Sequence, residues 1–308
     1  MQSAQKYLAK GQLDKAIAEY AQLVRDDPKD ARTLLKIGDI YARKGASQEA
    51  CSTYQQVALQ YAGQGFFLKA VAVYKQILKL EPNHMGTLEQ LADMYRLLHL
   101  ASDAVITYEQ IYAAYTRTGD VERALEALAK MVDVDPTNVA GWVRYAEALA
   151  ETGRVDEAVE AYANGARMLK EQGRLEDYLK VVERMFYHRP DDLGLACESA
   201  EVYLDLNDAR PALIKLQACF KANPKDVRTL ELLARSFQQL GQQNKTVSVY
   251  KEIARLHGQE GRLEEQARAL QKVLELNPAD REAEISWRKF LSKPDRGRRR
   301  SRSRYIKA

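Results

Sequence analysis

Six of the eight prolines in this 308-residue chain recur on a regular grid. They are separated by 54, 54, 54, 34 and 54 residues and stand at Pro28, Pro82, Pro136, Pro190, Pro224 and Pro278. Proline lacks an amide donor and keeps the preceding residue out of the helical region, so each of them is expected to end a helix. A fixed period of this kind predicts a repeat protein whose units pack mainly on their neighbours.

The segment from Gln64 to Pro82 illustrates one element of the repeat. Its apolar residues recur at intervals of three and four, which puts them on one stripe of an α-helix: Phe67, Ala70, Val71, Tyr74, Ile77 and Leu78. No run of alternating apolar and polar residues, the pattern of a half-buried strand, interrupts the chain. The sequence therefore predicts an all-α protein.

Small and aromatic residues recur at fixed places in a 34-residue frame. The matching positions are Leu34, Ile37, Gly38, Tyr41, Ala50 and Tyr54 in residues 31–62, and Trp142, Tyr145, Ala146, Leu149, Ala158 and Tyr162 in residues 139–162. This pattern resembles the tetratricopeptide repeat. The resemblance implies a right-handed α-solenoid built from helix pairs, in which most of the tyrosines and Trp142 pack between helices.

The 54-residue intervals exceed the 34-residue repeat by 20 residues, the length of one further helix with its turn. We interpret residues 29–82, 83–136, 137–190 and 225–278 as three-helix units, and residues 191–224 as an ordinary helix pair. Residues 1–28 are then expected to form a truncated first repeat, because Met1 falls at the fifth frame position. This predicts that the chain is a fragment of a longer protein or has a trimmed start. Residues 279–292 are predicted to be a capping helix that ends the 29–278 solenoid.

Glycine recurs at the turn after the first helix of each frame. Eight glycines stand at this place: Gly11, Gly45, Gly65, Gly119, Gly153, Gly173, Gly241 and Gly261. We expect a left-handed backbone there, which glycine adopts without strain. Asn207 at the same place tolerates that conformation, whereas His99 fits it poorly.

The basic character of the chain is confined to its C-terminus. The formal net charge is +4, yet residues 293–308 hold eight Lys or Arg and one Asp, so residues 1–292 sum to −3. The three cysteines, Cys51, Cys197 and Cys219, are far apart and each is expected to be a buried residue in a reduced, cytoplasmic compartment. No apolar segment is long enough to span a membrane, and no leader is recognised.

No catalytic or cofactor-binding pattern occurs. The four histidines are scattered, and the metalloprotease, paired-cysteine and glycine-rich phosphate motifs are absent. The acidic pairs Asp26 and Asp27, and Asp191 and Asp192, flank prolines and are expected to cap helix starts. We therefore predict a protein that is not an enzyme and needs no metal or cofactor, although a regulatory part of an enzyme lost upstream of Met1 remains an alternative.

The family resemblance implies that first-helix side chains line the inner groove and contact a peptide or helix of a partner protein. The alternative for any one of these residues is solvated helix surface. A charged lining of this kind selects complementary segments and speeds their capture. Along the chain the charge of this lining is first basic, then mixed, then acidic and then mixed again. The predicted partner-binding residues are Arg32, Lys36, Asp39, Arg43, Glu89, Asp93, Arg96, Arg144, Glu147, Glu151, Glu198, Glu201, Asp205, Arg228, Glu231 and Arg235.

The tail at residues 293–308 has six arginines interleaved with Gly and Ser, and it cannot build a core. It is predicted to be disordered. Such a tail can contact nucleic-acid phosphates, so a nucleic-acid-associated helical repeat is the alternative function. For the tail itself, we favour the interpretation as a solubilising terminus.

Three blocks, residues 29–39, 64–82 and 241–252, resemble cytoplasmic tetratricopeptide scaffolds of deltaproteobacteria. Some members of that group act in polar surface motility and link a small Ras-like GTPase to type IV pili. The resemblance implies a non-catalytic bacterial scaffold with that class of partner. No GTPase-contact residue is implied by it.

Overall fold

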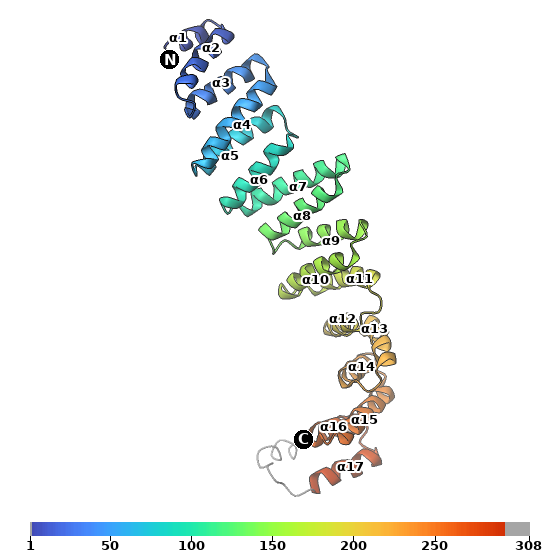
Figure 1. The fold of residues 1–308 in the computed structure, drawn as a ribbon. Coiled ribbons are helices and arrows are strands. Elements are labelled where there is room, and N and C mark those ends of the chain that lie inside the picture. The colour runs from blue at the N-terminus through green and yellow to red at the C-terminus, as the bar shows by residue number, and fades with distance from the viewer. Residues whose placement is uncertain (1, 293–308) are drawn as a thin grey trace. The chain divides into compact units, whose positions relative to one another are not determined.

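The computed structural model describes residues 2–292 (Figure 1), and within that range it contains seventeen α-helices and no strand. The all-α prediction is confirmed. Two helices precede the first proline of the grid, α1 (Gln2–Ala9) and α2 (Leu13–Asp26). The last helix, α17 (Arg281–Ser292), follows the last proline, and the predicted tail at 293–308 lies outside the described residues.

The predicted three-helix units are confirmed by the helix boundaries between the prolines. The first two units contain α3 (Ala31–Lys44), α4 (Ser47–Gly63) and α5 (Phe67–Leu80), then α6 (Met85–Leu97), α7 (Ala101–Thr118) and α8 (Val121–Val134). The other two contain α9 (Val139–Glu151), α10 (Val155–Glu171) and α11 (Leu175–His188), and α14 (Val227–Gln239), α15 (Gln243–Gln259) and α16 (Leu263–Leu276). The ordinary pair at 191–224 is α12 (Leu193–Asp205) and α13 (Ala209–Ala222).

The described residues form two compact units, which divide between Met168 and Leu169. In the first unit each helix from α1 to α8 packs on the next one along the chain. In the second unit the same holds from α11 to α17, and α12 also contacts α14. This neighbour-on-neighbour packing is that of a solenoid. The boundaries predicted after residues 28 and 278 stay predictions.

The six regularly spaced prolines form one kind of connection between consecutive helices. The residue before each proline is extended, with φ between −131° and −141°, and it ends the preceding helix. The residue two places after the proline then caps the next helix; Asp192, for example, accepts a hydrogen bond from the Leu195 amide at 2.9 Å. The prediction that Asp26 and Asp27 cap a helix start is wrong. Asp26 is the last residue of α2, and Asp27 accepts from the Lys29 amide within the turn.

The other kind of joint is a left-handed turn. The eight predicted glycines have φ between +69° and +79°, and Asn207 has φ of +59°, as expected. His99 adopts the same conformation with φ of +55°, although a Cβ atom is strained in it. The turn geometry therefore overrides the residue preference at this place in the repeat.

Replacing His99 with glycine is expected to raise the free energy of unfolding by about 1 kcal/mol, because a left-handed backbone strains a residue with a Cβ atom by about 1–2 kcal/mol. Urea unfolding followed by circular dichroism measures the effect. Asn207→Gly is the matched control and should change stability by a few tenths of a kcal/mol, since asparagine tolerates this conformation. A His99→Gly variant no more stable than the parent would show that the turn carries no strain.

The tyrosine of the middle helix is buried in three of the four three-helix units, and Tyr250 of the unit α14–α16 is half-buried. Tyr54 and Tyr108 are buried, as predicted, and the Tyr54 hydroxyl donates to Asp39 at 2.7 Å. All three cysteines are also buried, and burial raises the pKa of the Cys219 thiol to about 12, which keeps it protonated at neutral pH. Trp142, predicted to pack between helices, is half-buried.

Candidate functional site

The sixteen predicted partner-binding residues all lie on first helices of their units, α3, α6, α9, α12 and α14. None of them is buried. Lys36, Asp93 and Arg235 are half-buried, and the other thirteen are exposed. The structure thus gives every one of them access to solvent, and their role in binding stays a prediction.

Several of these residues are already paired with one another. Arg228 and Arg235 on α14 donate to Glu201 and Asp205 on α12, at 3.1 and 2.7 Å. The stretch of α12 expected to be acidic is therefore partly neutralised by the next first helix. These pairs are solvent-exposed, and such pairs contribute about 0–1 kcal/mol, so a partner can displace them at little cost.

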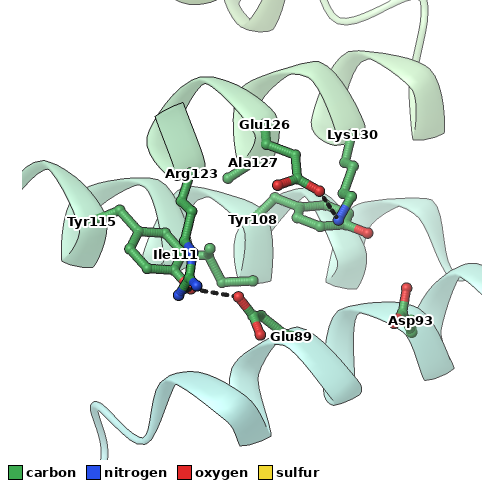
Figure 2. Close-up of a pocket in the computed structure, with 9 residues that line it drawn as sticks. All are labelled: Glu89, Asp93, Tyr108, Ile111, Tyr115, Arg123, Glu126, Ala127 and Lys130. Atoms are coloured by element: carbon green, nitrogen blue, oxygen red, sulfur yellow. Dashed lines mark hydrogen bonds and ion pairs between the residues drawn. The ribbon is translucent and has the colours of Figure 1, made fainter. Parts of the chain in front are cut away.

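The predicted residues Glu89 and Asp93 line a hollow of about 340 Å³ in the unit α6–α8 (Figure 2). The two residues stand one turn apart on α6 and form one wall. The buried side chains of Tyr108, Ile111 and Tyr115 on α7 form the floor. The opposite wall comes from α8 and consists of Arg123, Glu126, Ala127 and Lys130. First and third helices thus face each other across the middle helix.

A polar bridge crosses this hollow. The Tyr115 hydroxyl donates to Glu89 Oε1 at 2.5 Å, and Arg123 Nη1 donates to the Tyr115 hydroxyl at 3.4 Å. The Arg123 guanidinium also lies over the Tyr115 ring, 5.6 Å from its centroid. The hydrogen bond to Glu89, with burial, raises the pKa of Tyr115, so the phenol keeps its proton and can donate. The bridge joins α6, α7 and α8 (Figure 2).

The rest of the α8 wall carries charge of both signs. Lys130 Nζ lies 2.7 Å from Glu126 Oε1, one turn away on the same helix, and this contact raises the pKa of the Lys130 ammonium. Figure 2 shows both side chains on the α8 side and Asp93 on the α6 side of the hollow. A segment lying in the hollow would meet acidic groups from α6 and both signs from α8.

Sequence reasoning missed the contribution of the third helix. The predicted set contains first-helix residues only, whereas Arg123, Glu126 and Lys130 belong to α8. A signal was present, since these charged residues are spaced by three and four around the small Ala127 and so share one face. The tetratricopeptide pattern describes pairs of helices, so it assigns no position to a third helix such as α8.

The unit α14–α16 holds a second hollow, of about 710 Å³, at the equivalent place. It runs along α14 from Val227 to Gln238, and from Arg262, the residue before α16, along that helix to Glu275. Tyr250, Ile253 and His257 on α15 form its floor. The predicted residues Glu231 and Arg235 line it, so the structure brings together predicted residues of α14 with residues of α16 that were not predicted.

The described residues contain no metal centre. Within residues 2–292 no three His, Cys, Asp or Glu side chains are arranged to hold an ion. Over the same residues no helix is long and apolar enough to cross a membrane.

Comparison with known families finds repeat models in four stretches. Residues 4–45 match a model described as TPR repeat, and residues 32–63, 115–169 and 247–280 match models described as tetratricopeptide repeat. The stretch 115–169 begins within the α6–α8 hollow and 247–280 includes most of the α14–α16 hollow. No curated protein matches the chain.

Comparison with solved structures finds other helical proteins. A structure named "Crystal structure of MamA protein" shares 16% identity, covers 69% of this chain and 94% of its own, and has a TM-score of 0.24. Another, "MamA MSR-1 C2", shares 19% identity over 61% of this chain and 94% of its own, with a TM-score of 0.31. A third, "Crystal structure of APC/C hetero-tetramer Cut9-Hcn1", shares 14% identity over 94% of this chain and 74% of its own, with a TM-score of 0.25. At such TM-scores we base no conclusion on these likenesses.

Proposed function

We propose that this chain, which carries tetratricopeptide repeats, is a non-catalytic scaffold that holds a partner protein in its inter-helix hollows. The observation that carries the proposal is the repeated construction of these hollows. In α6–α8 and in α14–α16, charged side chains on two facing helices stand over a floor of aromatic and aliphatic side chains. Such a surface offers burial to apolar groups of a peptide or helix and charge selection along its edges.

The proposal extends to a class of partner. The three sequence blocks that resemble deltaproteobacterial scaffolds suggest a cytoplasmic role in bacterial surface motility with a Ras-like GTPase. The test is binding of purified Ras-like GTPases, loaded with GDP or with a non-hydrolysable GTP analogue. Binding in neither state removes the motility part of the proposal and leaves the scaffold role intact.

Affinity capture from lysate of the source cells, with four baits, tests the scaffold role. The baits are the full chain, a chain ending at residue 292, an Asp93→Lys/Lys130→Glu variant in the α6–α8 hollow, and a Lys79→Glu/Glu160→Lys control on exposed surface outside both hollows. We expect the hollow variant alone to lose at least one partner protein that the control keeps. Identical capture by all four baits would contradict the proposal.

The same experiment separates the alternative function. If the chain ending at residue 292 alone loses its captured material, and nuclease or moderate salt strips that material from the full chain, the arginine-rich tail binds nucleic acid. The scaffold proposal would then be replaced by that of a nucleic-acid-associated helical repeat.

A further inference from the structure

The hollows of α6–α8 and α14–α16 are two versions of one site. Every lining position of the first has a counterpart 142 residues later, because Pro82 and Pro136 correspond to Pro224 and Pro278. The floor and part of the walls are the same in both, as the pairs Tyr108 and Tyr250, Ile111 and Ile253, Ala127 and Ala269, and Lys130 and Lys272 show. Differences at the remaining positions therefore report on what each hollow can hold.

The bridge that crosses the first hollow has no equivalent in the second. Glu89, Tyr115 and Arg123 are replaced by Glu231, His257 and Glu265, that is, by two carboxylates and an imidazole. Within residues 2–292 no hydrogen bond or ion pair joins these three side chains. The α14–α16 hollow has about 710 Å³ against about 340 Å³ for the bridged one. The second hollow thus has no cation at the place of Arg123, although Arg235 and Arg268 stand at the places of Asp93 and Glu126.

The basic side chains of the second hollow do not supply a cation at the position that corresponds to Arg123. Three of the four are held in ion pairs, Arg235 with Asp205, Arg262 with Glu260 and Lys272 with Glu275. The fourth, Arg268, is exposed on α16 and has no ion-pair partner among the described residues. Glu231 and Glu265 also have no ion-pair partner there. The unpaired carboxylates stand on opposite walls, α14 and α16.

The floor between those walls carries a further unsatisfied group. His257 is 5% exposed, and its Nδ1 is buried without a hydrogen-bond partner in the described residues. Burial first, and then Arg262, lower the pKa of His257, while Glu265 and Glu231 act in the opposite direction. The imidazole is therefore neutral at neutral pH and keeps one ring nitrogen as an acceptor. A buried polar atom without a partner usually has an unseen one, such as a water or a ligand.

We propose that the α14–α16 hollow binds a lysine or arginine side chain of the partner protein, held between Glu231 and Glu265 above His257. This inference rests on the proposed scaffold function and names the chemistry that one of its hollows selects. The incoming ammonium or guanidinium donates to both carboxylates, whereas in the first hollow the Tyr115 hydroxyl, which itself accepts from Arg123, donates to Glu89. Charge-assisted hydrogen bonds of this kind are stronger than neutral ones.

Selection of a random 12-residue peptide library on the immobilised full chain tests the inference. The enriched peptides are expected to share a Lys or Arg, and replacing that residue with norleucine or citrulline should weaken binding at least tenfold. Glu231→Gln and Glu265→Gln should each weaken binding of the synthesised peptide about tenfold, with folding checked by circular dichroism. Glu264→Gln, an exposed neighbour on α16 outside the hollow, is the control and should leave the affinity unchanged.

Two results overturn the inference while keeping the scaffold function. One is enrichment of acidic peptides, which would mean that the arginines and Lys272 of the hollow bind the peptide and that the carboxylates do not. The other is a basic peptide whose affinity is the same for the Glu231→Gln, Glu265→Gln and Glu264→Gln variants. Failure to enrich any peptide, together with identical protein capture by the four baits, would overturn the scaffold function and this inference with it.

Discussion

Replacing Leu128 with alanine is expected to lower the free energy of unfolding by about 3 kcal/mol. Leu128 lies on α8 and is 0% exposed, and α8 packs on α7 and on α9. Removal of a fully buried leucine side chain loses its transfer free energy and leaves a cavity that the surrounding helices fill only in part. In a solenoid this loss is local, because each helix is stabilised mainly by its neighbours.

Urea unfolding followed by circular dichroism measures the total effect, and hydrogen exchange shows where it occurs. We expect faster exchange in α7, α8 and α9, and little change in α1 to α3. Leu68→Ala on α5 is the control, because that side chain is 67% exposed and its loss should change stability by about 0.5 kcal/mol or less. Equal losses for the two variants would mean that Leu128 is not the packing residue the structure indicates.

The helix boundaries were predictable because single proline and glycine residues mark them. Each grid proline fixes an extended residue before it, and each turn glycine permits a positive φ, so helix ends follow from local chemistry. His99 is the instructive exception. Its preference opposes the left-handed turn, yet the repeat on either side requires that turn, and the packing of α6 on α7 decides the conformation.

The hollow was predictable only in part. Glu89 and Asp93 were predicted from their first-helix places in the frame and both line the hollow, while their role in binding stays a prediction. Arg123 was missed, because its contribution depends on where the third helix of a 54-residue unit lies, which no local pattern specifies. The difference between Tyr115 and His257 is visible in the sequence, but its consequence for the width of the hollow depends on contacts among three helices.

Replacing Gly38 with alanine is expected to lower the free energy of unfolding by about 1–3 kcal/mol, although alanine is the better helix former by about 1 kcal/mol. A Cβ atom on Gly38 would lie 2.6 Å from Cε1 and 2.7 Å from Cδ1 of Tyr54. That ring cannot easily move aside, because Tyr54 is 3% exposed and its hydroxyl donates to Asp39 at 2.7 Å. The clash therefore strains the contact between α3 and α4.

Gly63→Ala provides the matched control for this substitution. Gly63 is the last residue of α4, and a Cβ atom there would meet nothing within 4 Å, so helix propensity alone should act and raise stability by about 0.5–1 kcal/mol. The two Gly→Ala changes thus have opposite expected signs in the same urea titration. A Gly38→Ala variant as stable as Gly63→Ala would show that the Tyr54 ring has room to shift. Because Asp39 is a predicted partner-binding residue, the same strain is expected to loosen the side chain that α3 presents to a partner.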